Sequence, residues 1–111
     1  MPELNKLTIS QAANGLRDKQ FSAEELLNAC MAAIGEKDGD INAFITVDED
    51  GAGMSARTVD KKLAKGEDLP VLAGIPVGIK DLICTKGVRT TCASPILRDF
   101  VPPYDATVIE K

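Results

Sequence analysis

Lys80 stands directly after a run of apolar residues and glycines, Leu-Ala-Gly-Ile-Pro-Val-Gly-Ile, at positions 72–79. Burying an ammonium group is costly, so a lysine in this place must be paired, reach water or stay neutral. Desolvation lowers the pKa of a lysine, and a neutral lysine is a base that can take a proton from a hydroxyl. The alternative is a lysine at the end of a strand, paired with Asp81 or another neighbour, with its charge in water. The residue pattern alone does not decide between these two interpretations.

Polar residues follow Lys80 at two places. Asp81 is interpreted as structural, holding a loop amide or a lysine. Because neighbours in a strand point to opposite faces, it is a poor candidate for the direct partner of Lys80. The cluster Thr-Thr-Cys-Ala-Ser at positions 90–94 predicts a turn that ends in a helix-capping serine. Its alternative is a strand edge that lines a pocket beside Lys80. Because a capping serine uses its oxygen on a backbone amide, Ser94 is a poor nucleophile.

The composition excludes several kinds of site. Among 111 residues there is no histidine, so Ser-His and Cys-His catalytic pairs are excluded. The three cysteines, Cys30, Cys84 and Cys92, have no C-x-x-C spacing, so no metal site is expected. Cys84 and Cys92 are interpreted as small buried hydrophobic residues. The pattern also contains no phosphate-binding glycine loop.

The charge and hydropathy patterns suggest a location and a limit on partners. The net charge of −4 argues against a basic nucleic-acid platform in these residues, but not against RNA bound by another part of a complex. No run reaches transmembrane length and no signal peptide opens the sequence, so a cytoplasmic protein with no membrane contact is expected.

The elements before Lys80 are predicted to be mainly helical. Thr8 and Gln11 form a capping box that starts a helix to about Lys19. Ser22 caps a second helix, with Phe21 packed on its first turn, that ends between positions 35 and 39. Alternation over positions 41–47 predicts a strand, and the acidic residues 48–50 start a third helix that ends at Gly66.

The elements around and after Lys80 are predicted to be strands and turns. Residues 77–83 are expected to form a buried strand, followed by a turn at positions 86–87 and a second strand at positions 88–92. Ser94 and Pro95 predict a short helix through Phe100, and Asp105 is expected to cap a last helix. The fold class is therefore α/β, with helices followed by a few strands. We expect one incomplete domain over residues 1–111, helical over 1–70 and built of the lysine strand and turns over 71–111, because the last helix has no closing cap.

Three stretches resemble a known family. Residues 72–81 resemble the lysine segment of the amidase signature family. Within it, Cys-Thr-Lys-Gly-Val-Arg-Thr-Thr-Cys-Ala-Ser at 84–94 and Phe-Val-Pro-Pro-Tyr-Asp-Ala-Thr at 100–107 are similar to the A subunits of the aspartyl/glutamyl-tRNA amidotransferases. The resemblance is close over residues 72–111 and looser over residues 1–70.

The resemblance implies a mechanism and partners. The family has an α/β/α fold and a Ser–cis-Ser–Lys triad, in which Lys80 matches the catalytic lysine. The triad attacks the side-chain amide of glutamine, forms an acyl-enzyme and releases ammonia. With B and C subunits, such an enzyme converts Glu-tRNA(Gln) or Asp-tRNA(Asn) to the amidated form. ATP and magnesium are then expected mainly on a partner subunit, with no cofactor on this chain.

Both serines of the triad belong to a Gly-Gly-Ser-Ser-Gly-Gly region that these 111 residues do not contain. The chain is therefore expected to be the N-terminal part of the enzyme and to be inactive by itself. Two alternatives remain: a stand-alone amidase of the same family that acts on another amide or a urea derivative, and a non-catalytic binding domain.

Overall fold

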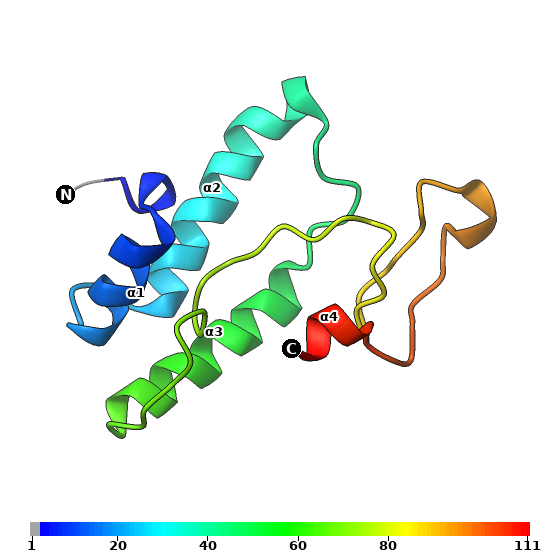
Figure 1. The fold of residues 1–111 in the computed structure, drawn as a ribbon. Helices are drawn as coiled ribbons and strands as arrows, with labels where there is room; N and C mark the ends of the chain where they lie inside the picture. Colours follow the sequence, from blue (N-terminus) through cyan, green and yellow to red (C-terminus); the bar gives the residue numbers. More distant parts are fainter. Residues whose placement is uncertain (1–2) are drawn as a thin grey trace. The chain divides into compact units, whose positions relative to one another are not determined.

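The computed structural model describes residues 3–111, which form helices joined by long loops (Figure 1). The chain divides into two compact units, and each is described by itself. The helical unit contains residues 3–42 and 49–76, and the loop unit contains residues 43–48 and 77–111. Lys80 and the polar cluster of residues 90–94 both belong to the loop unit.

The helical unit begins with the 3-10 helix η1, Leu4–Lys6, and the helix α1, Ile9–Arg17. The predicted capping box is confirmed. The amide of Gln11 donates to the Thr8 hydroxyl at 3.2 Å, and the amide of Thr8 donates to the Gln11 side chain at 2.9 Å. Two backbone donors that the first turn cannot satisfy are paired in this way. The helix ends two residues before the predicted Lys19, which has a left-handed φ of 56°.

The helix α2, Ala23–Ile41, starts as predicted and ends later than predicted. Ser22 caps it by accepting a hydrogen bond from the amide of Glu25 at 3.0 Å. The expected end between positions 35 and 39 is wrong, because the helix continues through both glycines there. It stops at Asn42, whose left-handed conformation suits asparagine. The strand predicted over positions 41–47 is therefore wrong, since Ile41 is still helical.

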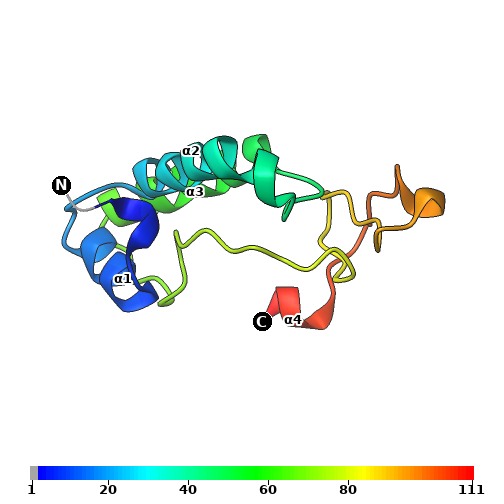
Figure 2. The same ribbon diagram turned by 90° about the horizontal axis from the view of Figure 1, so that it is seen from above.

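The helix α3, Glu49–Ala64, follows the acidic residues as predicted. It lies beside α2 and runs antiparallel to it, as Figures 1 and 2 show. Apolar faces of α1, α2 and α3 meet in one core, as their periodicity predicts. The buried members of this core are Ala12, Leu16, Ala23, Leu26, Leu27 and Ala56.

Residues 70–76 close this core before the chain leaves the helical unit. Gly74 has a φ of 84°, which favours glycine. A Cβ atom placed there would lie 3.0–3.3 Å from side-chain atoms of Leu16, Val59 and Ala23, one from each helix. Side chains from all three helices therefore approach the backbone at Gly74 closely.

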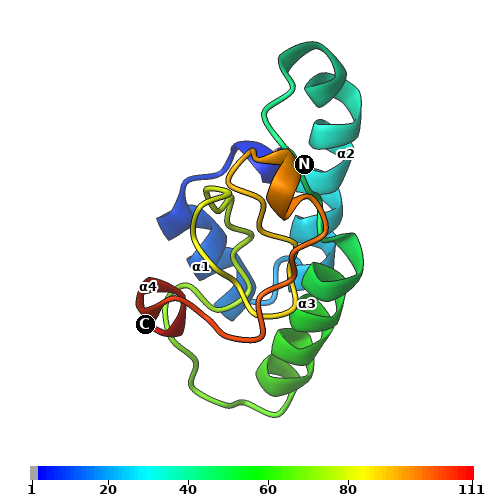
Figure 3. The same ribbon diagram turned by 90° about the vertical axis from the view of Figure 1, so that its right-hand side faces the viewer.

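The loop unit contains no strand within residues 3–111, which corrects the predicted strands at positions 77–83 and 88–92. It holds one isolated antiparallel bridge between Thr85 and Val88, around the turn predicted at positions 86–87. Figure 3 draws residues 77–111 without a strand arrow. A strand needs a neighbour along its length to satisfy its backbone groups. The extended residues 77–80 form no ladder with another part of the described chain.

Backbone hydrogen bonds between residues 84–90 and residues 100–106 hold the loop unit together. They run from Gly87 to Pro102 at 3.1 Å, from Thr90 to Phe100 at 3.0 Å and from Ala106 to Cys84 at 2.8 Å. The 3-10 helix η2, Pro95–Leu97, is shorter than the predicted helix through Phe100.

The helix α4, Thr107–Glu110, begins near the predicted position, but Asp105 does not cap it. The carboxylate of Asp105 instead accepts a hydrogen bond from the amide of Lys86 at 2.6 Å.

Candidate active-site segment

Lys80 lies at the end of the extended residues 77–80 and is exposed to water. Its carbonyl accepts a hydrogen bond from the amide of Ile83 at 3.0 Å, which closes a turn over residues 80–83. Its side chain has no hydrogen bond or ion pair with any other part of residues 3–111. The sequence left open whether Lys80 is neutral, paired with a neighbour or in water. In this structure its side chain is in water and does not pair with Asp81. The catalytic role of Lys80 stays a prediction.

Asp81 holds the polar cluster that follows it in the sequence. Its Oδ1 accepts a hydrogen bond from the amide of Thr91 at 2.9 Å, and its Oδ2 accepts from the amide of Ala93 at 3.1 Å and from the Thr91 hydroxyl. Its carbonyl accepts from the amide of Cys92 at 2.9 Å. The prediction that Asp81 holds a loop amide is confirmed. We call this set of hydrogen bonds from residues 91–93 to Asp81 the Asp81 clamp.

The clamp holds a turn with an unusual backbone. The amide of Ser94 donates to the carbonyl of Thr91 at 2.9 Å, so residues 91–94 form the predicted turn. Both central residues, Cys92 and Ala93, have left-handed φ values of 51° and 56°. Such a pair is typical of a primed turn, in which asparagine and glycine are the usual residues. For residues with a Cβ atom, the left-handed conformation costs about 1–2 kcal/mol each.

The same hydrogen bonds change the titration of Asp81. The Thr91 hydroxyl, then the Thr91 amide, lower the pKa of the Asp81 carboxyl by binding its charged form. The carboxylate is therefore ionised throughout the neutral range. Thr91 itself is buried, with 3% of its surface exposed. Its hydroxyl therefore donates its hydrogen bond to Asp81 and not to water.

The remaining polar residues of the segment have structural partners. Ser94 caps η2 by accepting a hydrogen bond from the amide of Ile96 at 3.3 Å, as predicted. Cys84 is half-buried, and its sulfur lies 3.9 Å from the hydroxyl of Tyr104, which raises the pKa of that tyrosine. Cys92 is exposed, so the prediction that it is buried is wrong. The reason is the turn, which points outward at this position.

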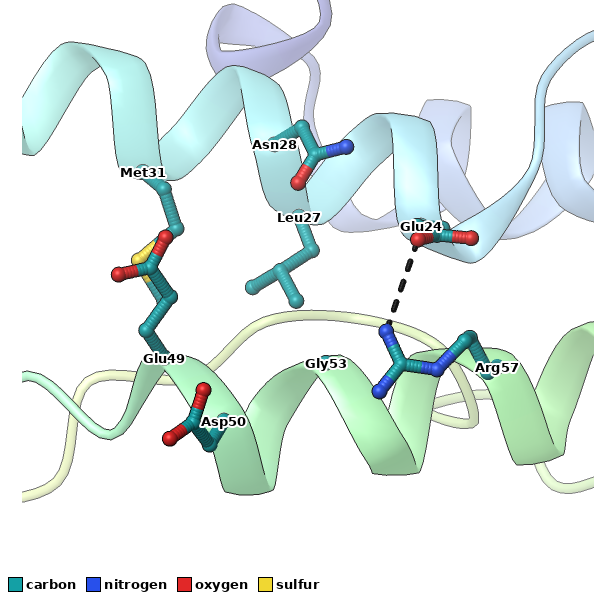
Figure 4. Close-up of a pocket in the computed structure, with 8 residues that line it drawn as sticks. All are labelled: Glu24, Leu27, Asn28, Met31, Glu49, Asp50, Gly53 and Arg57. Atoms are coloured by element: carbon teal, nitrogen blue, oxygen red, sulfur yellow. Dashed lines mark ion pairs between the residues drawn. The ribbon is translucent and has the colours of Figure 1, made fainter.

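A groove of about 200 Å³ lies between α2 and α3, within the helical unit (Figure 4). Glu24 and Arg57 form an ion pair across it at 3.6 Å, with both side chains about half exposed. Its other lining residues are Leu27, Asn28, Met31, Glu49, Asp50 and Gly53. Surface ion pairs of this kind contribute little to stability. The groove contains no residue of the 72–81 segment, and we interpret it as a packing feature of the two helices.

The residues present do not suit a metal. Within residues 3–111, no three histidine, cysteine, aspartate or glutamate side chains lie close enough to hold an ion. None of the helices in the same residues combines the length and apolar character needed to cross a membrane.

Comparison with known proteins identifies the family. The model of a family described as Amidase matches residues 25–111, which include Lys80 and the whole Asp81 clamp. The chain belongs to the amidase family. Members named as the A subunit of glutamyl-tRNA(Gln) amidotransferase are similar to it over almost its whole length. The protein from Alkaliphilus metalliredigens is 46% identical over 109 residues, and that from Azotobacter vinelandii is 51% identical over 108 residues.

These relatives are much longer than this amidase-family chain. The alignments cover 98% and 97% of the chain and 22% of each relative. A solved structure, described as a vestigial protein complex that reveals the origins of an s-triazine catabolic enzyme, is 32% identical with a TM-score of 0.88. It covers 94% of the chain, which in turn covers 23% of that structure. The amidase-signature fold that the sequence implied is therefore supported, although no strands form in residues 3–111.

Proposed function

We propose that this chain is the N-terminal part of the glutamine-hydrolysing A subunit of a tRNA-dependent amidotransferase. The observation that carries the proposal is the identity of 46–51% to such A subunits over almost the whole chain. These relatives are named as amidotransferase A subunits, which favours an amidotransferase over a stand-alone amidase. In the complete enzyme, ammonia from glutamine converts Glu-tRNA(Gln), or Asp-tRNA(Asn), to the amidated tRNA.

Lys80 takes the part of the base in this proposal. In a complete site it accepts a proton from a serine hydroxyl, and that serine activates the serine that attacks the amide carbon. Lys80 is exposed in residues 3–111, and we propose that the rest of the domain covers it, since burial favours the neutral form of a lysine. The 111 residues contain no Gly/Ser-rich region with paired serines, and we propose that they do not hydrolyse glutamine by themselves.

Exposed apolar side chains of the loop unit support a larger domain around Lys80. Val77, Ile79 and Leu82 expose 66%, 44% and 55% of their surfaces, and Val101 and Val108 expose 50% and 65%. Removing such apolar side chains from water is favourable. We propose that the rest of the amidase domain covers them.

The partners follow from the same proposal. B and C subunits bind the complete A subunit, and the tRNA reaches the site through the complex. ATP and magnesium are held mainly by a partner, and the chain itself holds no cofactor. The complex acts in the cytoplasm.

Co-expression with B and C subunits tests this assignment. The full-length A subunit should co-purify with both and should transfer ammonia from glutamine to Glu-tRNA(Gln) or Asp-tRNA(Asn) in the presence of ATP. A full-length protein that binds neither subunit, and hydrolyses simple amides instead, would support the stand-alone amidase. A chain that binds a partner but supports no hydrolysis at any length would support the binding-domain alternative.

A further inference from the structure

The Asp81 clamp lies next to the proposed base in the sequence. Lys80 is bonded to Asp81, and the Asp81 carbonyl accepts the amide of Cys92 at 2.9 Å. One residue and one hydrogen bond therefore separate the backbone of Lys80 from the turn of residues 91–94.

The turn is held against its own preference. Cys92 and Ala93 both have a left-handed backbone, although neither is glycine or asparagine. Without the clamp, the turn would relax to a conformation that residues with a Cβ atom prefer. Strained backbone that the surrounding structure maintains is concentrated at sites of function. This turn keeps its backbone strain, and its anchor, Asp81, is next in sequence to Lys80, the one residue for which a catalytic role is predicted.

The clamp also leaves part of the turn accessible. The amides of Thr91, Cys92 and Ala93 point to Asp81, while the side chains of Cys92 and Ala93 are exposed. Lys80 is exposed as well. The clamp thus fixes the backbone of two accessible elements, the turn of residues 91–94 and Lys80, and Asp81 is the anchor of both.

We propose that Asp81 is a positioning residue of the amidase site. It holds the turn of residues 91–94 and the backbone of Lys80 as one rigid element, and this element forms part of the wall against which the carboxamide substrate is aligned. The inference rests on the proposed function. Asp81 does not contact the reacting atoms, and it acts through the turn and through Lys80.

The test uses the full-length A subunit in complex with its partners, with glutaminase turnover measured per correctly folded site. Asp81→Asn removes the charge that orders the turn. We expect kcat to fall between about tenfold and 10²-fold, as for a small misplacement of catalytic groups. The pH at which the rate is half-maximal should not change, because Asp81 does not act through its charge on Lys80.

Two further variants make the test specific. Asp105→Asn changes another carboxylate of the loop unit that holds a loop amide, that of Lys86, and should leave kcat within about twofold, as surface substitutions away from a site do. Ala93→Gly, added to Asp81→Asn, should recover part of the lost kcat, because glycine adopts the required φ without the clamp at one of the two left-handed positions.

The outcomes separate the two proposals. If the wild-type complex releases no ammonia from glutamine, the proposed function fails and this inference fails with it. If the wild type is active and Asp81→Asn keeps its kcat, the proposed function stands and the inference is wrong. A shifted pH profile would also overturn the inference, since Asp81 would then act by its charge. The absence of any rescue by Ala93→Gly would overturn it too, since Asp81 would then not act through the turn.

Discussion

Asp60 joins α3 to the first turn of α2, and removing its carboxylate should destabilise the helical unit. Its Oδ1 accepts a hydrogen bond from the amide of Ala23 at 2.7 Å, and its Oδ2 accepts from the amide of Glu24 at 3.1 Å. The Ser22 hydroxyl satisfies the next amide of the same turn. Asp60 therefore caps α2 from another helix, where a negative charge is favourable.

The magnitude follows from the burial of the two donors. Ala23 is completely buried, so water cannot replace the lost partner of its amide. Leaving that amide unsatisfied costs about 1–3 kcal/mol. The amide of Glu24 is less buried, and its loss adds about 1 kcal/mol, as for an ordinary cap. The total for Asp60→Ala is about 2–4 kcal/mol in the free energy of unfolding, and Asp60→Asn should fall between this value and the wild type.

Urea denaturation, followed by far-ultraviolet circular dichroism of the 111-residue chain, measures this difference. The control is Arg57→Ala, which removes the exposed ion pair between the same two helices at 3.6 Å and should cost about 0–1 kcal/mol. If Asp60→Ala destabilises the chain no more than Arg57→Ala does, the capping argument is refuted. Asp60→Asn keeps an acceptor and provides the measurement if the alanine variant does not fold.

Four further predictions use the same chain. Gly74→Ala should destabilise it by about 2–4 kcal/mol in urea, because it adds a left-handed strain of about 1–2 kcal/mol and overpacks the core; an unchanged midpoint would contradict this. Gly53→Ala should instead stabilise α3 by about 0.5–1 kcal/mol, because the added Cβ meets only the movable guanidinium of Arg57, and a loss of stability would count against it. Burial raises the pKa of Cys30, so alkylation followed by mass spectrometry should label exposed Cys92 first; the reverse order would be contrary to the structure. Asp81 has a lowered pKa in the fold, so its contribution to stability is present above the unfolded pKa of about 3.9 and is lost as the pH falls through the lower folded pKa. The NMR signals of the Thr91 and Ala93 amides should therefore move only in that acid range, and movement near neutral pH would refute the clamp.

Short-range features of the fold were predictable from the sequence. The capping box at Thr8 and the cap at Ser22 depend on residues three positions apart, so the printed sequence contains all their partners. Apolar residues spaced three or four positions apart supply the core, as amphipathic helices require. The turn of residues 91–94 was predicted for the same local reason.

Features that depend on distant partners were missed. Residues 41–47 alternate like a strand, but α2 extends through Gly39 to Ile41 despite the weak helix preference of glycine. A strand was predicted over residues 77–83, but strand formation needs a neighbour that residues 3–111 do not provide. Asp60 lies 37 residues from Ala23 and 36 residues from Glu24, whose amides it caps, and no sequence pattern indicates this contact. Asp81 was expected to hold a loop amide, although the strained turn that it fixes was not foreseen.

The central claim is that Lys80 is the base of a glutamine-hydrolysing site, and one measurement tests it most directly. Ammonia release from glutamine is compared for the full-length complex with the wild-type sequence, with Lys80→Ala and with Lys86→Ala, which changes an exposed lysine six positions away. We predict that Lys80→Ala abolishes release while Lys86→Ala leaves it unchanged, and that the 111-residue chain releases none. A Lys80→Ala complex with wild-type turnover would contradict the claim.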